Sequence, residues 1–378
     1  MIISALKSKE TTDTRSPIHL ETISSILSLE TSIMFEEGIG AGIYTDDNAF
    51  EKLGLNAASR NDCLSKANLI ITLQPLSNDE LDLVAKGSTI LGTVNPFYNQ
   101  EHIDECKKRG INLVSMEFIP RITRAQKMDV LSSQANLAGY KSVILGGVEM
   151  GKIFPMLMTS AGTIKPATVV IFGAGVAGLQ AIATAKRLGA NVWVSDIRPE
   201  TKEQVASLGG KFIEVGELDN VTTEGGYVKD VSDDFLKKQK EAVLEKVIQA
   251  DLVITTALVP GKKAPLLISD DMVSQMKPGS VIVDMAVSQG GNCELSELNK
   301  VVKKHNVKIV GEGNLPATLP INASELFAKN IQNFVQHLTE DGKLKWDLED
   351  EITAGSLILK NGDVFQESLK KVFQTEAV

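Results

Sequence analysis

Three glycines and an aspartate carry the most specific chemical signal in this sequence of 378 residues. Gly173, Gly175 and Gly178 follow an apolar run in the spacing GxGxxG, and Asp196 follows a second apolar run about 20 residues later. Such a loop lets backbone N–H groups approach a pyrophosphate, and a carboxylate placed like Asp196 accepts the hydroxyls of an adenosine ribose. These residues predict a dinucleotide site.

The elements around the loop are those that such a site needs. The apolar run Val169–Phe172 predicts a strand, and a helical stretch rich in Ala and Leu follows the loop and closes at Gly189. Gly173 permits the tight turn off the strand, and Gly178 allows the helix to pack closely on the sheet. The positive end of the helix then faces the phosphates.

The acid after the second run decides between the two nicotinamide dinucleotides. Asp196 would repel a 2′-phosphate, whereas Arg198, two residues further on, is of a type that can hold one. With the acid in place, NAD(H) is the favoured ligand.

Composition excludes several classes of function. The formal net charge of −9 argues against nucleic acid and anionic membranes as partners. The N-terminus turns polar too soon for a signal peptide, and charged residues interrupt every apolar stretch well short of the roughly 18 residues of a membrane span. The three cysteines and four histidines stand too far apart for a disulfide framework or a metal site, so we expect a cytoplasmic protein without metal.

Short apolar runs alternate with helical patterns along the chain, which predicts an α/β protein with parallel sheets. Two sets of strands, joined by one long helix, suggest two Rossmann-like domains flanking a cleft. The first set is Ile2–Ala5, Ser32–Phe35, Leu69–Leu73, Ile90–Thr93 and Asn112–Ser115. The second is Thr168–Phe172, Asn191–Ser195, Lys211–Ile213, Leu252–Thr255, Val281–Asp284 and Lys308–Val310. No repeat is visible in the sequence.

A helix near the C-terminus is expected to return to the first domain. Asn322 is placed to cap it, with Glu325 three residues on. Its apolar face consists of Phe327, Ile331, Phe334, Val335 and Leu338. The expected domains are therefore residues 1–130 with 318–378, and an inserted nucleotide domain, 131–317.

Two further segments contain candidate ligand contacts. Residues 215–233 show no apolar periodicity and contain Gly226 and Tyr227, which is typical of a lid, although an exposed tyrosine explains them equally well. Residues 121–140 begin with Arg121, Gln126, Asp129 and Ser132, groups able to bind an amide and a diphosphate. By their chemistry alone, a solvated helix start is the commoner explanation.

These segments, with TTALVPG at 255–261, resemble the NAD(H)-binding alpha subunit of the proton-translocating NAD(P) transhydrogenase family. The resemblance is strong between about residues 119 and 291. It implies catalytic roles for Arg121, Gln126, Asp129 and Tyr227. It implies cofactor contacts for Gln126, Lys127, Met128, Asp129, Ser132, Gly173, Gly175, Val176, Gly178, Asp196, Ile197, Arg198, Gly226, Tyr227, Gln239 and Leu258.

The resemblance also implies partners. In the family this subunit is a homodimer that binds NAD(H), docks on an NADP(H)-binding beta subunit, and associates with the inner membrane through a small membrane alpha subunit. Hydride passes directly between the nicotinamides and is coupled to proton movement. Two departures, Ser288 and Ala317-Thr318, bear on docking and nicotinamide positioning.

Two alternatives remain at this stage. An alanine dehydrogenase shares the expected fold, but the regions where it would hold a lysine and a histidine read Ile71–Leu76 and Thr93–Pro96, and neither contains such a residue. Arg15 alone is a poor carboxylate site. A regulatory NAD-binding module without turnover is the second alternative, since hydride transfer needs no protein nucleophile.

Overall fold

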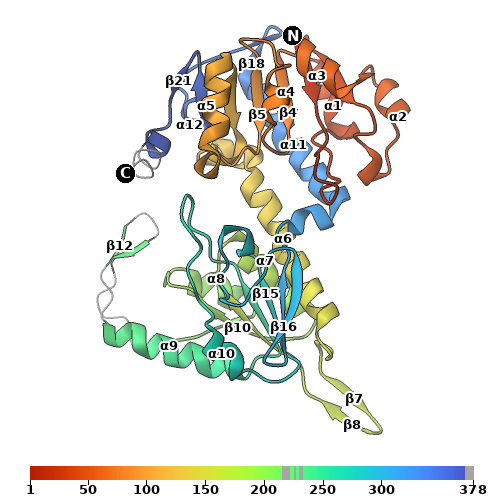
Figure 1. Cartoon of the computed structure of the whole chain (residues 1–378). Helices are drawn as coiled ribbons and strands as arrows, with labels where there is room; N and C mark the ends of the chain where they lie inside the picture. Colours follow the sequence, from red (N-terminus) through yellow and green to blue (C-terminus); the bar gives the residue numbers. More distant parts are fainter. Residues whose placement is uncertain (215–221, 225–226, 230–232, 371–378) are drawn as a thin grey trace. The chain divides into compact units, whose positions relative to one another are not determined.

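The computed structural model describes residues 1–214, 222–224, 227–229 and 233–370, with side chains undescribed between 222 and 240 (Figure 1). The chain divides into two compact units. Unit 1 comprises residues 1–134 together with the described residues from 316 onward, and unit 2 comprises residues 135–315. Unit 2 is therefore inserted in the sequence of unit 1.

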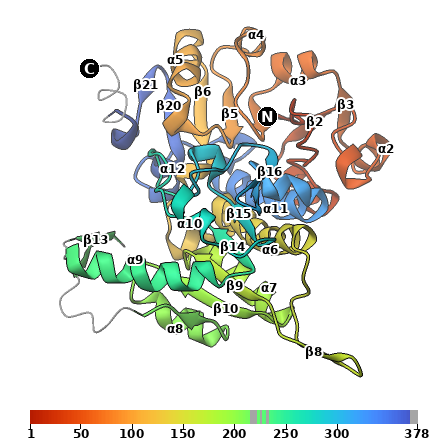
Figure 2. The same ribbon diagram turned by 60° about the horizontal axis from the view of Figure 1, so that its bottom comes forward.

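The described part of unit 1 is built on an eight-stranded sheet. Its strands are β1 (Ile2–Ala5), β2 (Ser32–Glu36), β3 (Asn56–Ala58), β4 (Leu69–Thr72), β5 (Thr89–Gly92), β6 (Asn112–Ser115), β20 (Leu357–Lys360) and β21 (Asp363–Val364). They lie in the order β21-β20-β6-β5-β4-β1-β2-β3 (Figure 2). The first six are parallel, whereas β20 and β21 each pair antiparallel.

Both faces of this sheet are covered. Successive residues of β4 point to opposite faces: Leu69 and Ile71 belong to one apolar core and Ile70 to the other. Burial on both sides explains why the central strands read as continuous apolar runs rather than alternating ones. The helices of the unit are α1 (Leu20–Leu27), α2 (Asp47–Glu51), α3 (Arg60–Lys66), α4 (Asn78–Leu81), α5 (Gln100–Arg109), α11 (Pro320–Leu338) and α12 (Glu351–Ser356).

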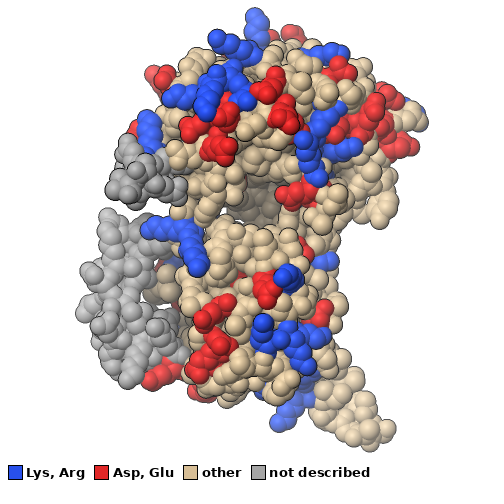
Figure 3. Space-filling model, in the orientation of Figure 1, with Lys and Arg blue, Asp and Glu red and all other residues tan. Residues whose placement is uncertain are grey.

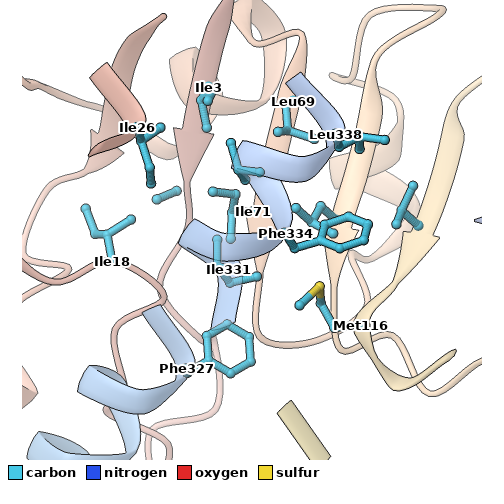
Figure 4. Close-up of a cluster of buried hydrophobic side chains, with 14 of the residues drawn as sticks. Ile3, Ile18, Ile26, Leu69, Ile71, Met116, Phe327, Ile331, Phe334 and Leu338 are labelled. Atoms are coloured by element: carbon cyan, nitrogen blue, oxygen red, sulfur yellow. The ribbon is translucent and has the colours of Figure 1, made fainter. Parts of the chain in front are cut away.

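Helix α11 supplies much of one core, as its pattern predicts. Phe327, Ile331 and Phe334 are fully buried and pack with Ile3 and Ile71 from the sheet (Figure 4). The predicted cap is wrong, because the helix begins two residues before Asn322. Pro320 starts the helix, since its fixed φ suits the first turn and its missing N–H costs nothing there.

Unit 2 has a seven-stranded sheet in its described part. Its strands are β9 (Thr168–Phe172), β10 (Asn191–Ser195), β11 (Lys211–Phe212), β14 (Leu252–Thr255), β15 (Val281–Asp284), β16 (Lys300–Lys304) and β17 (Val307–Gly311). The order is β11-β10-β9-β14-β15-β17-β16, with only β16 antiparallel in it. Its helices are α6 (Val130–Glu149, shared with unit 1), α7 (Val176–Arg187), α8 (Thr201–Ser207), α9 (Asp233–Ile248) and α10 (Asp270–Ser274).

The two units share one topology. Numbered along the chain, the six parallel strands of each sheet lie in the order 3-2-1-4-5-6, which is that of dinucleotide-binding folds. The prediction of two Rossmann-like α/β domains is confirmed. The two units resemble each other in strand order and not in amino-acid sequence, so no repeat is visible in the sequence.

Some elements carry no clear signal in the sequence. A hairpin of β7 (Leu157–Thr159) and β8 (Gly162–Ile164) has every strand residue exposed and forms an uncharged projection (Figure 3). Within the segment expected to be irregular, β12 (Thr222–Glu224) pairs antiparallel with β13 (Tyr227–Lys229). Strands β18 (Thr339–Glu340) and β19 (Lys343–Leu344) form another short pair. In the described ranges, no helix combines the length and apolarity that crossing a membrane requires.

Replacing Phe334 by Ala should destabilise unit 1 by about 3–5 kcal/mol, because the ring is fully buried in the core of Figure 4. Urea unfolding followed by circular dichroism measures the change. Leu53→Ala, at a side chain that is 44% exposed, serves as the control and should cost less than about 1 kcal/mol. Equal losses in the two variants would contradict the assigned packing of α11.

Candidate functional site

The glycine loop of unit 2 has the geometry that its spacing predicts. Gly173 has a φ of +97°, and its N–H donates to the carbonyl of Ser195 at 2.8 Å. A Cβ at Gly178 would lie 1.9 Å from the carbonyl oxygen of Gly173, so only glycine allows α7 to start this close to β9. Around Gly175, by contrast, a Cβ would meet nothing within 4 Å of the described residues. The loop is tight where it packs and open where a ligand would approach.

Helix α7 presents its N-terminus to this open space. No described side chain caps the helix, and its first turn contains no acidic residue. The N–H groups of that turn therefore keep their capacity to bind an anion. Val176, the first helical residue, is 41% exposed.

Asp196 stands beside the loop at the end of β10. Its Oδ2 accepts the N–H of Ala174 at 2.6 Å, and its two oxygens accept the guanidinium of Arg198 at 3.0 and 2.9 Å. Burial of this carboxyl raises its pKa, but the hydrogen bonds from Arg198 and Ala174 outweigh burial and hold the pKa below its usual range. The group is therefore an ionised acceptor at neutral pH. A ribose hydroxyl must displace the Arg198 guanidinium or share the oxygens with it.

The chain after β14 completes this edge of the sheet. The hydroxyl of Thr256 donates to the carbonyl of Phe172 at 2.9 Å, which ties the ends of β14 and β9 together. Asn292, fully buried, donates to the carbonyl of Ala257 at 2.9 Å and accepts its N–H at 3.1 Å. These contacts hold the segment that presents Leu258, whose side chain is 46% exposed.

Sequence reasoning missed Thr256, Asp284 and Asn292. Asp284 is fully buried at the end of β15 and accepts the N–H groups of Asn292 and Cys293 at 3.2 and 3.0 Å. A usable signal exists for Thr256, directly after β14, and for Asp284, the last residue of β15, because polar residues at the ends of buried parallel strands lie at the carboxyl edge, where ligands bind. Asn292 follows no strand directly, and no sequence pattern reveals its backbone partner, Ala257.

The second predicted group lies in unit 1 and extends from Arg121, two residues before the 3-10 helix η4 (Thr123–Met128), to Ser132 in the first turn of α6. Arg121, Gln126 and Lys127 are exposed, whereas Met128 is buried in the core beneath. Asp129 accepts the N–H and the hydroxyl of Ser132 at 2.9 and 2.6 Å and so caps the start of α6. The prediction of a helix start is thus confirmed, with the capping carboxylate held by Ser132, and Arg121, Gln126 and Lys127 remain exposed.

A hollow of about 640 Å³ opens beside η4 within unit 1. Polar side chains from η4 and α11 dominate its lining, together with one residue of α12. The lining residues are Thr123, Arg124, Gln126, Lys127, Met128, Asn333, Gln336, His337 and Ile352. Three of the predicted contacts therefore border this hollow, whereas Arg121, Asp129 and Ser132 lie along the chain on either side of it.

The sheet of unit 1 differs from that of unit 2 at the equivalent edge, where β1 is followed by Lys7 and Ser8 rather than by glycines. The Ser8 hydroxyl donates to Gln74 at 2.7 Å, beyond the end of β4. Arg60 donates to the carbonyl of Lys7 at 3.0 Å and is paired with Glu36 at 2.6 Å and with Glu80. At the point where this sheet reverses its strand order, the segments after β1 and β4 are thus bridged by the chain's own polar groups.

Three of the predicted cofactor contacts are not fully described by the structure. Gly226 is outside the described residues, and for Tyr227 and Gln239 only the backbone, in β13 and α9, is described. Among the described residues no group of three or more His, Cys, Asp or Glu side chains is arranged to hold a metal ion. The three cysteines are buried, and burial raises the pKa of Cys63 and Cys106 to about 12 and that of Cys293 to about 11. They are structural thiols.

The fold and the geometry of the site define the class of this protein. It is a dinucleotide-binding α/β protein of two Rossmann-like units, and one of these units carries the glycine loop. Residues 6–138 match the N-terminal domain and residues 142–367 the C-terminal domain of the family described as alanine dehydrogenase/PNT. An NAD(P) transhydrogenase alpha subunit of Rhodospirillum rubrum is 46% identical over 98% of this chain and 99% of that protein. The chain belongs to the NAD(P) transhydrogenase alpha-subunit branch of this family.

Solved structures agree with this assignment. A crystal structure of transhydrogenase from Sinorhizobium meliloti superposes with a TM-score of 0.87 at 39% identity, covering 96% of this chain and 100% of that one. An L-alanine dehydrogenase superposes with a TM-score of 0.82 at 22% identity, covering 99% of each chain, and shows the shared fold alone. The family is one of NAD-binding oxidoreductases.

Two glycine variants separate folding from binding. Gly175→Ala places its methyl group in open space, so thermal unfolding should shift by less than about 2 °C while NADH affinity falls by roughly tenfold or more. Gly178→Ala forces α7 away from Gly173 and should destabilise unit 2 by about 1–3 kcal/mol. Fluorescence titration with NADH and circular dichroism measure both effects. If Gly175→Ala binds NADH as the wild type does, the loop is not the pyrophosphate site.

Asp196→Asn should weaken NADH binding by roughly tenfold, since hydrogen bonds to charged groups contribute about 1.5 kcal/mol or more. The folded-state pKa is depressed, so the stabilisation from the ionised carboxylate is present above about pH 4 and is lost only at lower pH. The loss of affinity should therefore be the same at pH 6 and at pH 8. Asp104→Asn, at an exposed position of α5, is the control. A loss that differs between the two pH values would contradict this role.

Proposed function

We propose that the chain is the NAD(H)-binding subunit of a proton-translocating NAD(P) transhydrogenase. In this role it holds NAD(H) while a partner subunit holds NADP(H), and hydride passes directly between the two nicotinamides. The observation that carries the proposal is 46% identity along nearly the whole of both chains to a transhydrogenase alpha subunit.

The residues of unit 2 fit the adenosine and pyrophosphate parts of the dinucleotide. The N–H groups at the start of α7 and the space above Gly175 suit the pyrophosphate. Asp196 accepts the ribose hydroxyls and disfavours a 2′-phosphate, while Ile197 and Leu258, both exposed, suit the faces of the adenosine. Tyr227 is proposed to close the site.

The residues of η4 fit the nicotinamide end. Gln126 and Asp129 together offer an amide and a carboxylate, which satisfy the donors and acceptors of a carboxamide. Arg121 is exposed and is proposed to fix the ring for transfer. Bound NADH supplies the hydride, so the chain needs to bind, orient and exclude water rather than donate or accept protons.

A self-sufficient dehydrogenase is disfavoured by the contacts of unit 1. Arg15 is 9% exposed and its guanidinium is bound by Asp13 at 2.8 and 2.6 Å and by Gln134 at 3.0 Å. It is therefore poorly placed to bind a substrate carboxylate. Gln74 and Asn95 stand in the regions where an alanine dehydrogenase would hold its lysine and histidine, and neither can act as an acid or base at neutral pH.

The proposed assembly follows the family. We propose a homodimer that docks on an NADP(H)-binding beta subunit and reaches the inner membrane from the cytoplasmic side through a small membrane alpha subunit. Proton movement then takes place in the membrane partner, because this chain contributes only the NAD(H) side of the reaction.

Mixing the chain with an NADP(H)-binding partner domain tests the proposal. NADPH should reduce an acetylpyridine analogue of NAD⁺ at a rate well above the sum of the separate components, followed by the absorbance of the reduced analogue. Gly175→Ala serves as the matched control, since it should fold and yet be inactive.

Two outcomes would overturn the assignment. One is a mixture no faster than its separate components, which leaves an NAD-binding module without turnover. The other is oxidation of NADH by pyruvate and ammonia with this chain alone, which identifies an alanine dehydrogenase.

A further inference from the structure

The helix η4 has one face buried in the core of unit 1 and the opposite face exposed. Ala125 and Met128, three residues apart, are 0% and 3% exposed and pack in the core of unit 1 with Phe327 and Ile331 of α11. A 3-10 helix repeats every three residues, so this spacing puts both side chains on one face. Gln126 and the residue after it are consequently turned outward. Core packing therefore determines which side of η4 is exposed.

One buried amide of α11 makes those contacts. Asn330 is 7% exposed, and its Nδ2 donates to the carbonyl of Lys127 at 2.9 Å. Its Oδ1 accepts the hydroxyl of Ser133 at 2.7 Å. Lys127 lies in η4 and Ser133 in the first turn of α6, so one side chain joins the two elements on either side of Asp129.

A second link between η4 and the C-terminal part of the chain is weaker. Arg124 pairs with Asp350 at 2.7 Å, and Asp350 also lies 3.1 Å from Nε2 of His337. The Arg124 side chain is 61% exposed, and ion pairs in water contribute little. The amide of Asn330, by contrast, is 7% exposed, and the loss of a hydrogen bond costs more when one of its groups is buried. Asn330 is therefore the stronger of these two links.

We infer that Asn330 is a positioning residue for the nicotinamide end of NADH. It acts through the backbone of Lys127 and the hydroxyl of Ser133, and sets the separation of Gln126 and Asp129. The inference rests on the proposed role of these two residues. It adds a residue that lies about 200 positions further along the chain and touches neither the nucleotide nor the reacting atoms.

The test compares two ligands that differ in the nicotinamide. ADP-ribose carries the adenosine and pyrophosphate of NADH without the ring, so it reports on unit 2 alone. Asn330→Asp keeps the size of the side chain and the acceptor for Ser133 but cannot donate to Lys127 when ionised. The variant should bind ADP-ribose within about twofold of the wild type and bind NADH about tenfold more weakly. With the partner domain, kcat should fall roughly 10- to 100-fold, more than KM changes.

Two further variants show whether the change in affinity is specific to the Asn330 hydrogen bonds or follows from a loss of stability. Asn322→Asp makes the same chemical change at an exposed position of α11 and should leave both affinities unchanged. Ser133→Ala removes the other half of the link and should lower NADH affinity in the same direction by a smaller factor. Titration calorimetry for ADP-ribose and fluorescence for NADH give the affinities, and thermal unfolding checks each variant.

The possible results separate this inference from the proposed function. If Asn330→Asp loses affinity for both ligands equally, or for neither, the positioning role is wrong. If the wild type transfers hydride and the variant does so at the same rate, the inference fails while the proposed function stands. If NADH and ADP-ribose respond differently but the wild type shows no transfer with its partner, the positioning role stands and the proposed function fails.

Discussion

The nucleotide edge of unit 2 depends on the close approach of two backbone segments, at Gly178 and at the carbonyl of Gly173. No Cβ fits between them, and this proximity brings the start of α7 up against the end of β9. The N–H groups at the start of α7 then face the space above Gly175, and Asp196 reaches the N–H of Ala174 from the adjacent strand. A steric constraint at one residue thus determines where the helix dipole, the open loop and the carboxylate meet.

The two units show that topology alone does not make a nucleotide site. Both sheets reverse their strand order at the same point, between their first and fourth strands. In unit 2 a glycine loop leaves that point open, whereas in unit 1 the Ser8–Gln74 hydrogen bond bridges the segments that follow β1 and β4. The same strand order therefore accompanies an open glycine loop in unit 2 and a polar bridge in unit 1.

The sequence predicts those structural elements that depend on the spacing of nearby residues. Continuous apolar runs such as Leu69–Thr72 indicate buried parallel strands, and the glycine pattern indicates the turn after β9. Contacts between distant residues have no such signature: nothing near Asn292 indicates that it binds Ala257, and β20 joins β6 across more than 200 intervening residues. The predicted start of α11 is wrong for a different, local reason. Asn322 has a capping side chain, but the rigid φ of Pro320 fits the first turn and starts the helix earlier.

Hydride transfer between two bound nicotinamides makes unusual demands on a protein. No side chain has to donate or accept a proton, so having Gln74 and Asn95 in place of an acid or base is no defect for that reaction, although it would disable a dehydrogenase. What remains is geometry, and small displacements at a reacting centre are costly. For the reaction proposed here, the residues that hold the loops would therefore matter: Asn292, which binds Ala257, and Asn330, which binds Lys127, are each a buried amide bound to the backbone itself. A catalyst of this kind is defined as much by such amides as by the groups that meet the ligand.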